Sequence, residues 1–432
     1  MSTALSATDE ANAAVATRTA MLATITQALA ASAPAMDAPS LASLLGIKPK
    51  ALGFESLPVR VIDKALTAPA LNTQSVTPTP LTINQLPGCQ DAATIIHLSA
   101  EGIGAVKIPG VTVQRSVTGV DPSLAQALDP APANAGLSAD DALALMLSTQ
   151  VKAVWRIQLA PGTVLTQPLY LWLKPSHACE RIEIDCGARS QALIIQLTSR
   201  AAQPLGLTHT EVVVHEQSHI KHVCIDANHA DTVVLNRLVS HVQRDASYAQ
   251  LQLDVGAKFS RVRRDAHLLA AGATATLNAI LNVHAAKESH LYTHVTHHVP
   301  QTHSAQTTRG LGQHKGTGSD QSIVRINRHA HGARSTQSSR HLLLDPTAAL
   351  SARPILEIFN DDVKAAHGST VGTLDPAMAF YLRARGLSQA CAERLLVRAF
   401  WHEALVGFNE FGLSDWLDSA LHLTPQTAGQ RA

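Results

Sequence analysis

Residues 211–225 read Glu-Val-Val-Val-His-Glu-Gln-Ser-His-Ile-Lys-His-Val-Cys-Ile. Two runs rich in β-branched residues flank a polar stretch, a pattern that predicts two short strands joined by a turn. The polar stretch, His215-Glu-Gln-Ser-His219, matches the HExxH pattern of zinc hydrolases, in which two histidines one helical turn apart bind the metal. Because strand patterns flank it on both sides, we predict a turn here and not a metalloprotease site.

The same alternation of short apolar runs and turn residues extends over residues 153–344. The runs are about 5–7 residues long and recur at roughly 10-residue spacing, which predicts a mainly β region. A sandwich, a barrel and a β-solenoid all fit this rhythm, and the lack of hairpin signals such as Asn-Gly favours the solenoid. The predicted strands are 154–159, 169–173, 181–185, 192–197, 211–215, 220–225, 232–239, 248–253, 275–283 and 291–299.

The flanking regions read differently. Residues 10–31 are alanine-rich with apolar residues near a helical period, and 41–45 and 139–147 also look helical. Residues 69–87 are rich in Thr, Pro and Asn and read as an extended linker. We therefore divide the chain into an N-terminal helical and linker region (1–150), a β core (151–350) and a C-terminal strand and helical subdomain (351–432).

Composition excludes several classes of protein. The 432 residues carry 34 Lys and Arg against 33 Asp and Glu, so no field of one sign is available to attract nucleic acid or an anionic membrane. The five cysteines are odd in number and form no CxxC pair, which fits a reducing compartment better than a disulfide framework. No signal peptide and no apolar run of ~18 residues are recognisable. We expect a cytoplasmic protein.

Histidine is abundant, with 22 residues. His290, His294 and His298 are four residues apart, so on a strand they would share one outward face but stand too far apart to bind one metal. A solvated strand face is the prediction, and a histidine-rich metal-storage protein remains an alternative.

No self-contained active site is recognisable in the sequence. Residues 310–316, Gly-Leu-Gly-Gln-His-Lys-Gly, lack the end of a Walker A motif, and no GxSxG elbow occurs. Asp361 and Asp362 are adjacent, so on a strand they would point to opposite faces. We expect a protein that is not an enzyme. The alternative is a β-solenoid enzyme acting on polysaccharide, which would need a cleft of acidic and basic residues on one face.

Two helices are predicted near the C-terminus. Asp375-Pro376 is a favoured helix start and Gly386 a favoured end, while Ser388 begins a second helix that Gly407 ends. Apolar residues lie on more than one face of this hairpin. One face could cap the β core and another could bind a partner protein, and the sequence leaves both readings open.

Residues 354–376 read Pro-Ile-Leu-Glu-Ile-Phe-Asn-Asp-Asp-Val-Lys-Ala-Ala-His-Gly-Ser-Thr-Val-Gly-Thr-Leu-Asp-Pro, and 380–386 read Phe-Tyr-Leu-Arg-Ala-Arg-Gly. We predict a strand over 355–359 and a turn carrying His367-Gly368, where the imidazole could face a partner or a metal, or bond to its own loop.

These segments resemble the signature of the SufB/SufD family of iron–sulfur cluster assembly scaffolds, and 364–372 resembles its SufD branch. Residues 181–189 and 335–344 resemble further family segments. The resemblance covers about 180–406, and the first 150 residues match poorly.

The resemblance implies a right-handed parallel β-helix with helical subdomains at its ends. It also implies a heterodimer with SufB, a nascent iron–sulfur cluster or iron at the shared interface, and a contributing histidine that matches His367. Many relatives have cysteine after the lysine, where this chain has Ala365. Reduced flavin is associated with the family complex, although no flavin motif is recognisable here, and a homodimer of the isolated chain stays open.

The resemblance further implies that the ATPase SufC docks on the C-terminal helices. Leu382 lies off the stripe formed by the other apolar residues of the first helix, so both helices cannot bury all their apolar residues against the β core. The expected partner-binding residues are Phe380, Leu382, Leu396 and Phe400.

Overall fold

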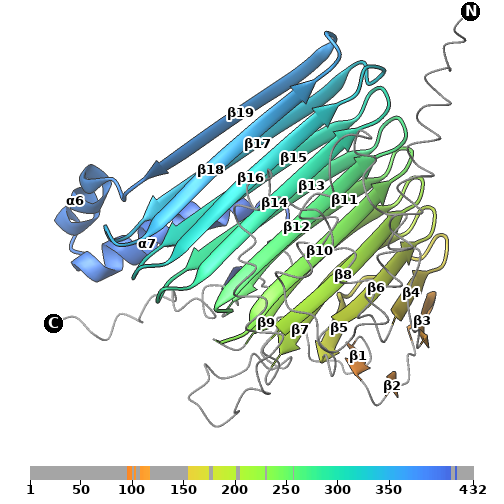
Figure 1. The fold of residues 1–432 in the computed structure, drawn as a ribbon, viewed down its shortest axis with the longest axis horizontal. Helices are drawn as coiled ribbons and strands as arrows, with labels where there is room; N and C mark the ends of the chain where they lie inside the picture. Colours follow the sequence, from red (N-terminus) through yellow and green to blue (C-terminus); the bar gives the residue numbers. More distant parts are fainter. Residues whose placement is uncertain are drawn as a thin grey trace, which may run out of the picture.

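The structure, a computed structural model, describes residues 95–99, 102–103, 108–116, 154–174, 179–200, 205–228, 231–255, 257–409 and 414–415 (Figure 1). The helices predicted at 10–31, 41–45 and 139–147 and the linker at 69–87 lie outside these residues. The strands are β1 (Ile95–Ser99), β2 (Gly102–Ile103), β3 (Val111–Ser116), β4 (Val154–Leu159), β5 (Leu169–Lys174), β6 (Cys179–Cys186), β7 (Gln191–Arg200), β8 (Leu205–Val214), β9 (His219–Asn228), β10 (Val233–Val242), β11 (Ser247–Val255), β12 (Phe259–Leu268), β13 (Thr274–Val283), β14 (Glu288–His297), β15 (His303–Gly312), β16 (Thr317–Ile326), β17 (Ala333–Leu343), β18 (Ala349–Ile358) and β19 (Val363–Gly372).

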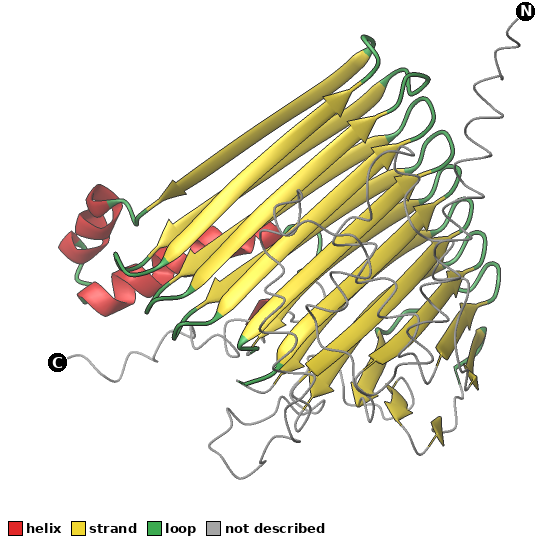
Figure 2. Ribbon diagram, viewed as in Figure 1, coloured by secondary structure: helices red, strands yellow, loops and turns green. Residues whose placement is uncertain are grey.

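Successive strands alternate between two sheets, as Figure 2 shows. Within the described residues, one sheet has ten strands in the order β19-β17-β15-β13-β11-β9-β7-β5-β1-β2, and the other has nine in the order β18-β16-β14-β12-β10-β8-β6-β4-β3. From β4 and β5 onward every pairing is parallel, whereas β1–β2 and β3–β4 are antiparallel. Each coil therefore adds one strand to each sheet. The predicted parallel β-helix is confirmed, and the mainly β character of 151–350 with it.

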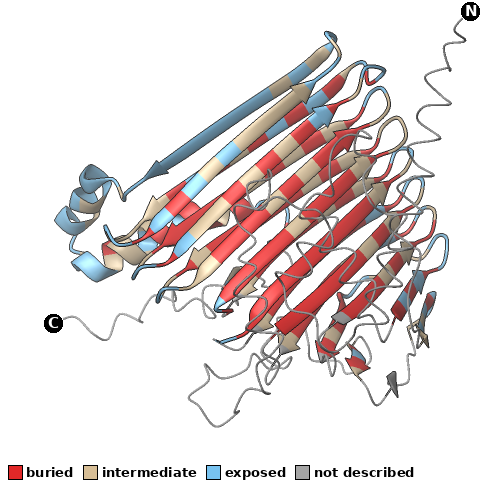
Figure 3. Cartoon of the chain, viewed as in Figure 1, coloured by how far each residue is buried: buried red, intermediate tan, exposed pale blue. Residues whose placement is uncertain are grey.

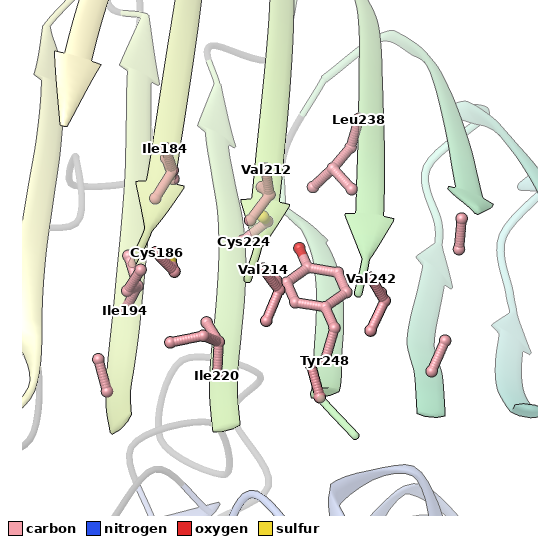
Figure 4. Close-up of a cluster of buried hydrophobic side chains, with 14 of the residues drawn as sticks. Ile184, Cys186, Ile194, Val212, Val214, Ile220, Cys224, Leu238, Val242 and Tyr248 are labelled. Carbon is pink, nitrogen blue, oxygen red and sulfur yellow. The ribbon is translucent and has the colours of Figure 1, made fainter. Parts of the chain in front are cut away.

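The first coils enclose an apolar core between the two sheets. Figure 4 shows Val212 and Leu238 of the nine-stranded sheet with Ile194 and Ile220 of the ten-stranded sheet in this space, where all four are buried. Alternate residues of a strand face one side, so every second residue enters the core. Each fully buried side chain of this size contributes about 1.5–3 kcal/mol, and the repeated coils add these contributions along the solenoid.

The HExxH-like segment is a turn, as predicted. β8 ends at Val214 and β9 begins at His219, with Gln217 at a φ of 57° between them. The two histidines have different partners: His215 Nε2 lies 2.8 Å from Asp185 Oδ1, and His219 Nδ1 lies 2.8 Å from Ser247 Oγ. The two rings therefore take part in separate contacts along the ridge of turns.

The later coils have a polar interior, which explains why β12, β15, β16 and β17 are missing from the predicted strands. Arg264 in β12 is buried and donates hydrogen bonds to Gln250 Oε1 (2.7 Å), the Asn278 carbonyl (2.7 Å) and Thr293 Oγ1 (2.7 Å). Polar side chains with such partners are tolerated inside. The strands were predicted from apolar runs, so strands with polar inner faces were not predicted.

The boundary predicted at residue 350 does not coincide with the end of a strand. It falls inside β18, which pairs in parallel with β16, and β19 continues the other sheet to Gly372. The boundary was predicted at the point where the regularly spaced apolar runs of the sequence become weaker. Regular strand pairing does not end there, because the backbone hydrogen bonds of a parallel ladder do not depend on apolar side chains.

The C-terminal helices form where capping residues predict them. α6 (Pro376–Ala384) has Asp375 as N-cap, whose side chain accepts a 2.8 Å hydrogen bond from the Ala377 amide, and Gly386 has a φ of 91° after its end. α7 (Gln389–His402) has Ser388 as N-cap. A short 3-10 turn, Glu403–Leu405, follows, and Gly407 has a φ of 88°. α7 and this turn pack against the outer face of the ten-stranded sheet.

Candidate functional site at the open end of the solenoid

The last coil of the solenoid leaves its strand edges uncovered. β18 and β19 stand at the ends of the two sheet orders, so among the described residues no strand pairs with their outer edges. Figure 3 shows β19 as the most exposed long strand, and all but two of its residues are exposed. Unpaired backbone N–H and C=O groups of an edge strand are a template for another chain.

Apolar side chains accompany this open edge. Ile358 at the end of β18, Phe359 in the following turn and Val371 in β19 are all exposed. Natural edge strands are commonly protected by charge, proline or a covering segment. β18 and β19 also carry Pro354 and Lys364, but the exposed apolar groups beside them are typical of a surface that another protein covers.

His367 lies in the middle of β19 and is exposed, in register with Gln337 of β17. The prediction of a turn at His367-Gly368 is wrong. The turn lies earlier, where Asn360 Oδ1 accepts a 2.9 Å hydrogen bond from the Asp362 amide. The small residues after His367 resemble a turn sequence, but an edge strand accepts them because no other described residue packs over them. A Cβ added at Gly368 would meet no atom within 4 Å.

His367 can act as one ligand of a shared site. Imidazole binds iron and other first-row metals through a neutral ring nitrogen. No group of three or more His, Cys, Asp or Glu side chains that could hold a metal ion occurs within the described part of the chain. Among the described residues, His367 is therefore not part of such a group.

The helical hairpin offers a second exposed surface, the α6 face, defined by Met378, Phe380 and Tyr381. Phe380 is 69% exposed and Tyr381 58%, and α6 has no buried residue. Leu382 and Leu396, two of the expected partner-binding residues, are half-buried. The α6 face is large, apolar and turned away from the sheet.

Phe400 does not belong to that surface. It is 9% exposed and packs with Val397 and Trp401 in the cluster that covers the ten-stranded sheet. The buried face of α7 comprises Ala392, Val397, Phe400 and Trp401. The assignment of Phe400 to the partner surface is therefore wrong, because the second helix has apolar residues on more than one face and only the fold decides which face meets the sheet.

A charged contact fixes the hairpin to the solenoid. Arg309 of β15 donates to Glu403 Oε2 through Nη2 at 2.6 Å and Nε at 2.9 Å, and Arg340 of β17 approaches the same oxygen at 3.1 Å. Asn278 Nδ2 donates a 2.7 Å hydrogen bond to the Ala404 carbonyl. Sequence reasoning missed these residues, since nothing local links positions 94 residues apart.

The predicted solvated histidine face is only partly right. His290 is buried and its ring nitrogens contact Ser319 Oγ (2.7 Å) and Glu288 Oε1 (2.8 Å). His298 Nε2 lies 3.1 Å from a ring nitrogen of His267. The His290 ring thus contacts Glu288 of its own strand and Ser319 of the next coil, and the contact with the next coil could not be predicted from the sequence of one strand.

In the part of the chain that the structure describes, no helix is both long enough and apolar enough to cross a membrane.

Residues 173–400, more than half of the chain and running from β5 into α7, match the family model described as the SufBD core domain of SUF-system iron–sulfur cluster assembly. The chain belongs to this family. The match contains the polar coils, the open edge with His367, α6 and most of α7. The SufB/SufD resemblance is confirmed.

Named relatives agree at modest identity. The chain is 33% identical over 110 residues to the iron–sulfur cluster assembly protein SufD of Escherichia coli, covering 26% of each protein. It is 27% identical over 205 residues to the chloroplastic protein ABCI7 of Arabidopsis thaliana, covering 46% of this chain and 42% of that one. A SufBD family protein of Staphylococcus epidermidis is 26% identical over 192 residues, covering 44% and 41%. The alignments thus span less than half of each relative.

Proposed function

We propose that this chain is a scaffold subunit of the Suf iron–sulfur cluster assembly complex, with no catalytic centre of its own. The observation that carries the proposal is His367, exposed in the middle of an unpaired edge strand within a SufBD core domain. The family match does not favour the alternative of a polysaccharide-acting enzyme. ATP hydrolysis would belong to a separate subunit, SufC.

The open edge of β19 is the proposed binding surface for SufB. A second β-solenoid that brings its own edge strand alongside β19 would satisfy the unpaired backbone groups and cover Val371. Such pairing would place a partner's side chains next to His367. The imidazole would then supply one ligand for iron or a nascent cluster, which is the substrate here, and the partner would supply the others.

The α6 face is the proposed docking surface for SufC. Its aromatic and methionine side chains are the residue types that protein interfaces favour. The contact of Glu403 with Arg309 and Arg340 would transmit movement of the hairpin to β15 and β17, the strands nearest β19. We therefore assign Phe380, Tyr381 and Met378 to the interface, with Leu382 and Leu396 beside them, and leave Phe400 to the core.

Co-expression with tagged SufB and SufC from one operon tests each surface. Phe380→Asp is expected to abolish recovery of SufC while SufB is still recovered. His367→Ala is expected to leave the complex and its ATPase activity intact while iron and acid-labile sulfide fall. Full recovery of SufC by Phe380→Asp, or a normal cluster yield with His367→Ala, would contradict the corresponding assignment.

A further inference from the structure

His367 belongs to the inner row of the last strand. Val363 and Ala365 of β19 are partly buried and pack against the interior core. Alternate residues of a strand face the same side of a sheet, so His367 continues this inner row. Among the described residues β19 is the last strand of its sheet, and the row is uncovered there. His367 therefore lies at the open mouth of the solenoid, on the side of β19 that faces the interior.

Gln337 is the neighbour of His367 in the preceding coil. β17 and β19 are adjacent in the ten-stranded sheet (Figure 1), and the register pairs Gln337 with His367. Paired strands lie about 4.8 Å apart, so the two side chains start side by side on the same inner face. Gln337 is 4% exposed, whereas His367 is exposed. The pair thus joins a buried amide to an accessible imidazole.

One end of the Gln337 amide is fixed and the other end has no partner. Nε2 donates a 3.0 Å hydrogen bond to the carbonyl of Ser322 in the opposite sheet. Since a carbonyl can only accept, the nitrogen must face Ser322. Oε1 is buried and has no hydrogen-bond partner, although buried polar atoms in native proteins nearly always have one. The interior therefore holds a fixed acceptor that lacks a donor.

Gln306, on the other side of Gln337, does not supply that donor. It is the register partner of Gln337 on β15. Both amide atoms of Gln306 are themselves without partners, so the two amides are not bonded to each other. The register neighbour on the remaining side is His367, and a ring N–H of an imidazole is a suitable donor.

Histidines elsewhere in the solenoid bond to their register partners. His219 Nδ1 lies 2.8 Å from Oγ of its partner Ser247. His290 Nδ1 lies 2.7 Å from Oγ of its partner Ser319. An imidazole on one coil thus reaches the side chain at the same position of the adjacent coil, and it does so through Nδ1.

We propose that Gln337 is a positioning residue for His367: its Oε1 accepts a hydrogen bond from Nδ1–H of His367, which leaves Nε2 for the partner side of the mouth. A hydrogen bond to one ring nitrogen fixes which nitrogen carries the proton and how the ring is turned. The role of Nε2 as a ligand of iron rests on the proposed function. The hydrogen bond itself rests only on the fold of this chain.

Nuclear magnetic resonance of the full chain, labelled with ¹⁵N in histidine, tests the hydrogen bond. The signals of His367 are identified by their loss in His367→Ala. In the wild type the Nδ1–H tautomer, the less common one of free histidine, should predominate. Gln337→Leu should return the ring to Nε2–H. A wild type with Nε2–H, or an unchanged tautomer in Gln337→Leu, would overturn the proposal.

Gln306→Leu is the matched control, because it makes the same change one coil farther from His367. It should leave the tautomer of His367 unchanged. Leucine fits this row of the solenoid, since Leu277 of β13 is the register partner of Gln306. Both variants should therefore fold, and equal thermal midpoints would show that a difference between them at His367 is local. A tautomer change of equal size in both variants would overturn the proposal.

Co-expression with tagged SufB and SufC gives the functional readout. Gln337→Leu is expected to lower iron and acid-labile sulfide by ~10-fold, with both partners recovered as by the wild type, and Gln306→Leu should give a normal yield. A normal yield in Gln337→Leu with a lowered yield in His367→Ala would overturn the positioning role and leave the proposed function standing. A normal yield in His367→Ala would contradict the proposed function, and the tautomer measurement would still decide the hydrogen bond.

Discussion

At the scale of single residues, burial decides which groups can take part in chemistry. Cys224 lies in the core, and burial raises the pKa of its thiol to about 12. Burial likewise raises the pKa of Cys186. His367 by contrast is exposed. The imidazole of His367 is thus available to another molecule, whereas Cys186 and Cys224 serve packing.

Cysteine reactivity should follow this division. In the native protein we expect iodoacetamide to modify Cys391, because hydrogen bonds with Ser388 and Arg394 lower the pKa of its thiol. Cys186 and Cys224 should react only after unfolding. Mass spectrometry of peptides labelled with and without denaturant measures this. Native labelling of Cys224 at the rate of Cys391 would contradict the burial.

Acid sensitivity should arise partly from His222. Burial lowers the pKa of its imidazole to about 3, and its Nδ1 lies 2.9 Å from the Tyr248 hydroxyl. In the unfolded chain His222 takes up a proton near pH 6.5, whereas in the folded chain it does not. The contribution of His222 to the free energy of unfolding is therefore full above about pH 6.5 and declines as the pH falls toward 3.

Replacement of His222 tests this directly. His222→Gln should reduce the slope of unfolding free energy against pH by at most about 1.4 kcal/mol per pH unit between pH 6 and 4. Gln250 is the register partner of His222 on the next coil, so a glutamine side chain fits at this position of the coil. Urea unfolding at several pH values gives the slope. An identical slope in the variant would show that other groups govern the acid response.

At the scale of elements, the sequence predicts features that neighbouring residues determine. It fails for features that depend on contacts with segments far away in the sequence. The helix start at Asp375-Pro376 and the end at Gly386 follow from capping alone, and both are confirmed. The burial of Phe400 and the strand position of His367 depend on the sheet beside them, so the sequence misassigned both. The polar strands were missed for the same reason, because the partners of Arg264 come from other coils.

The contact between Glu403 and Arg309 should stabilise the attachment of the hairpin. Arg309 is almost fully buried, and Glu403→Ala leaves its guanidinium without that carboxylate. We expect a loss of about 1.5–3 kcal/mol, the usual value for a hydrogen bond to a charged group. Urea unfolding and limited proteolysis near residues 373–388 measure the effect.

Arg340→Ala is the matched control, because Arg340 meets the same carboxylate but is half exposed. It should cost roughly 0.2–1 kcal/mol, as exposed ion pairs do. Equal losses in the two variants would show that burial of Arg309 has no special role in the attachment.

At the scale of the whole molecule, the solenoid has a direction. Apolar coils at one end give way to coils with polar interiors, and the last coil is uncovered. In a solenoid each coil contacts only its neighbours, so stability is a sum over adjacent coils. The end with His367 is thus the least supported by apolar packing and the most available for a partner.

The two ends of the solenoid provide a matched test of this direction. Val371 in β19 is 44% exposed and Val164, near the first coils, is 58% exposed. Lysine at either position should change stability by no more than about 0.5 kcal/mol, as is usual for surface substitutions. Lysine on an edge strand blocks the approach of another edge. Val371→Lys should therefore abolish recovery of SufB in co-purification, whereas Val164→Lys should recover it fully. Loss in both variants, or in neither, would mean that the partner does not bind at the β19 edge.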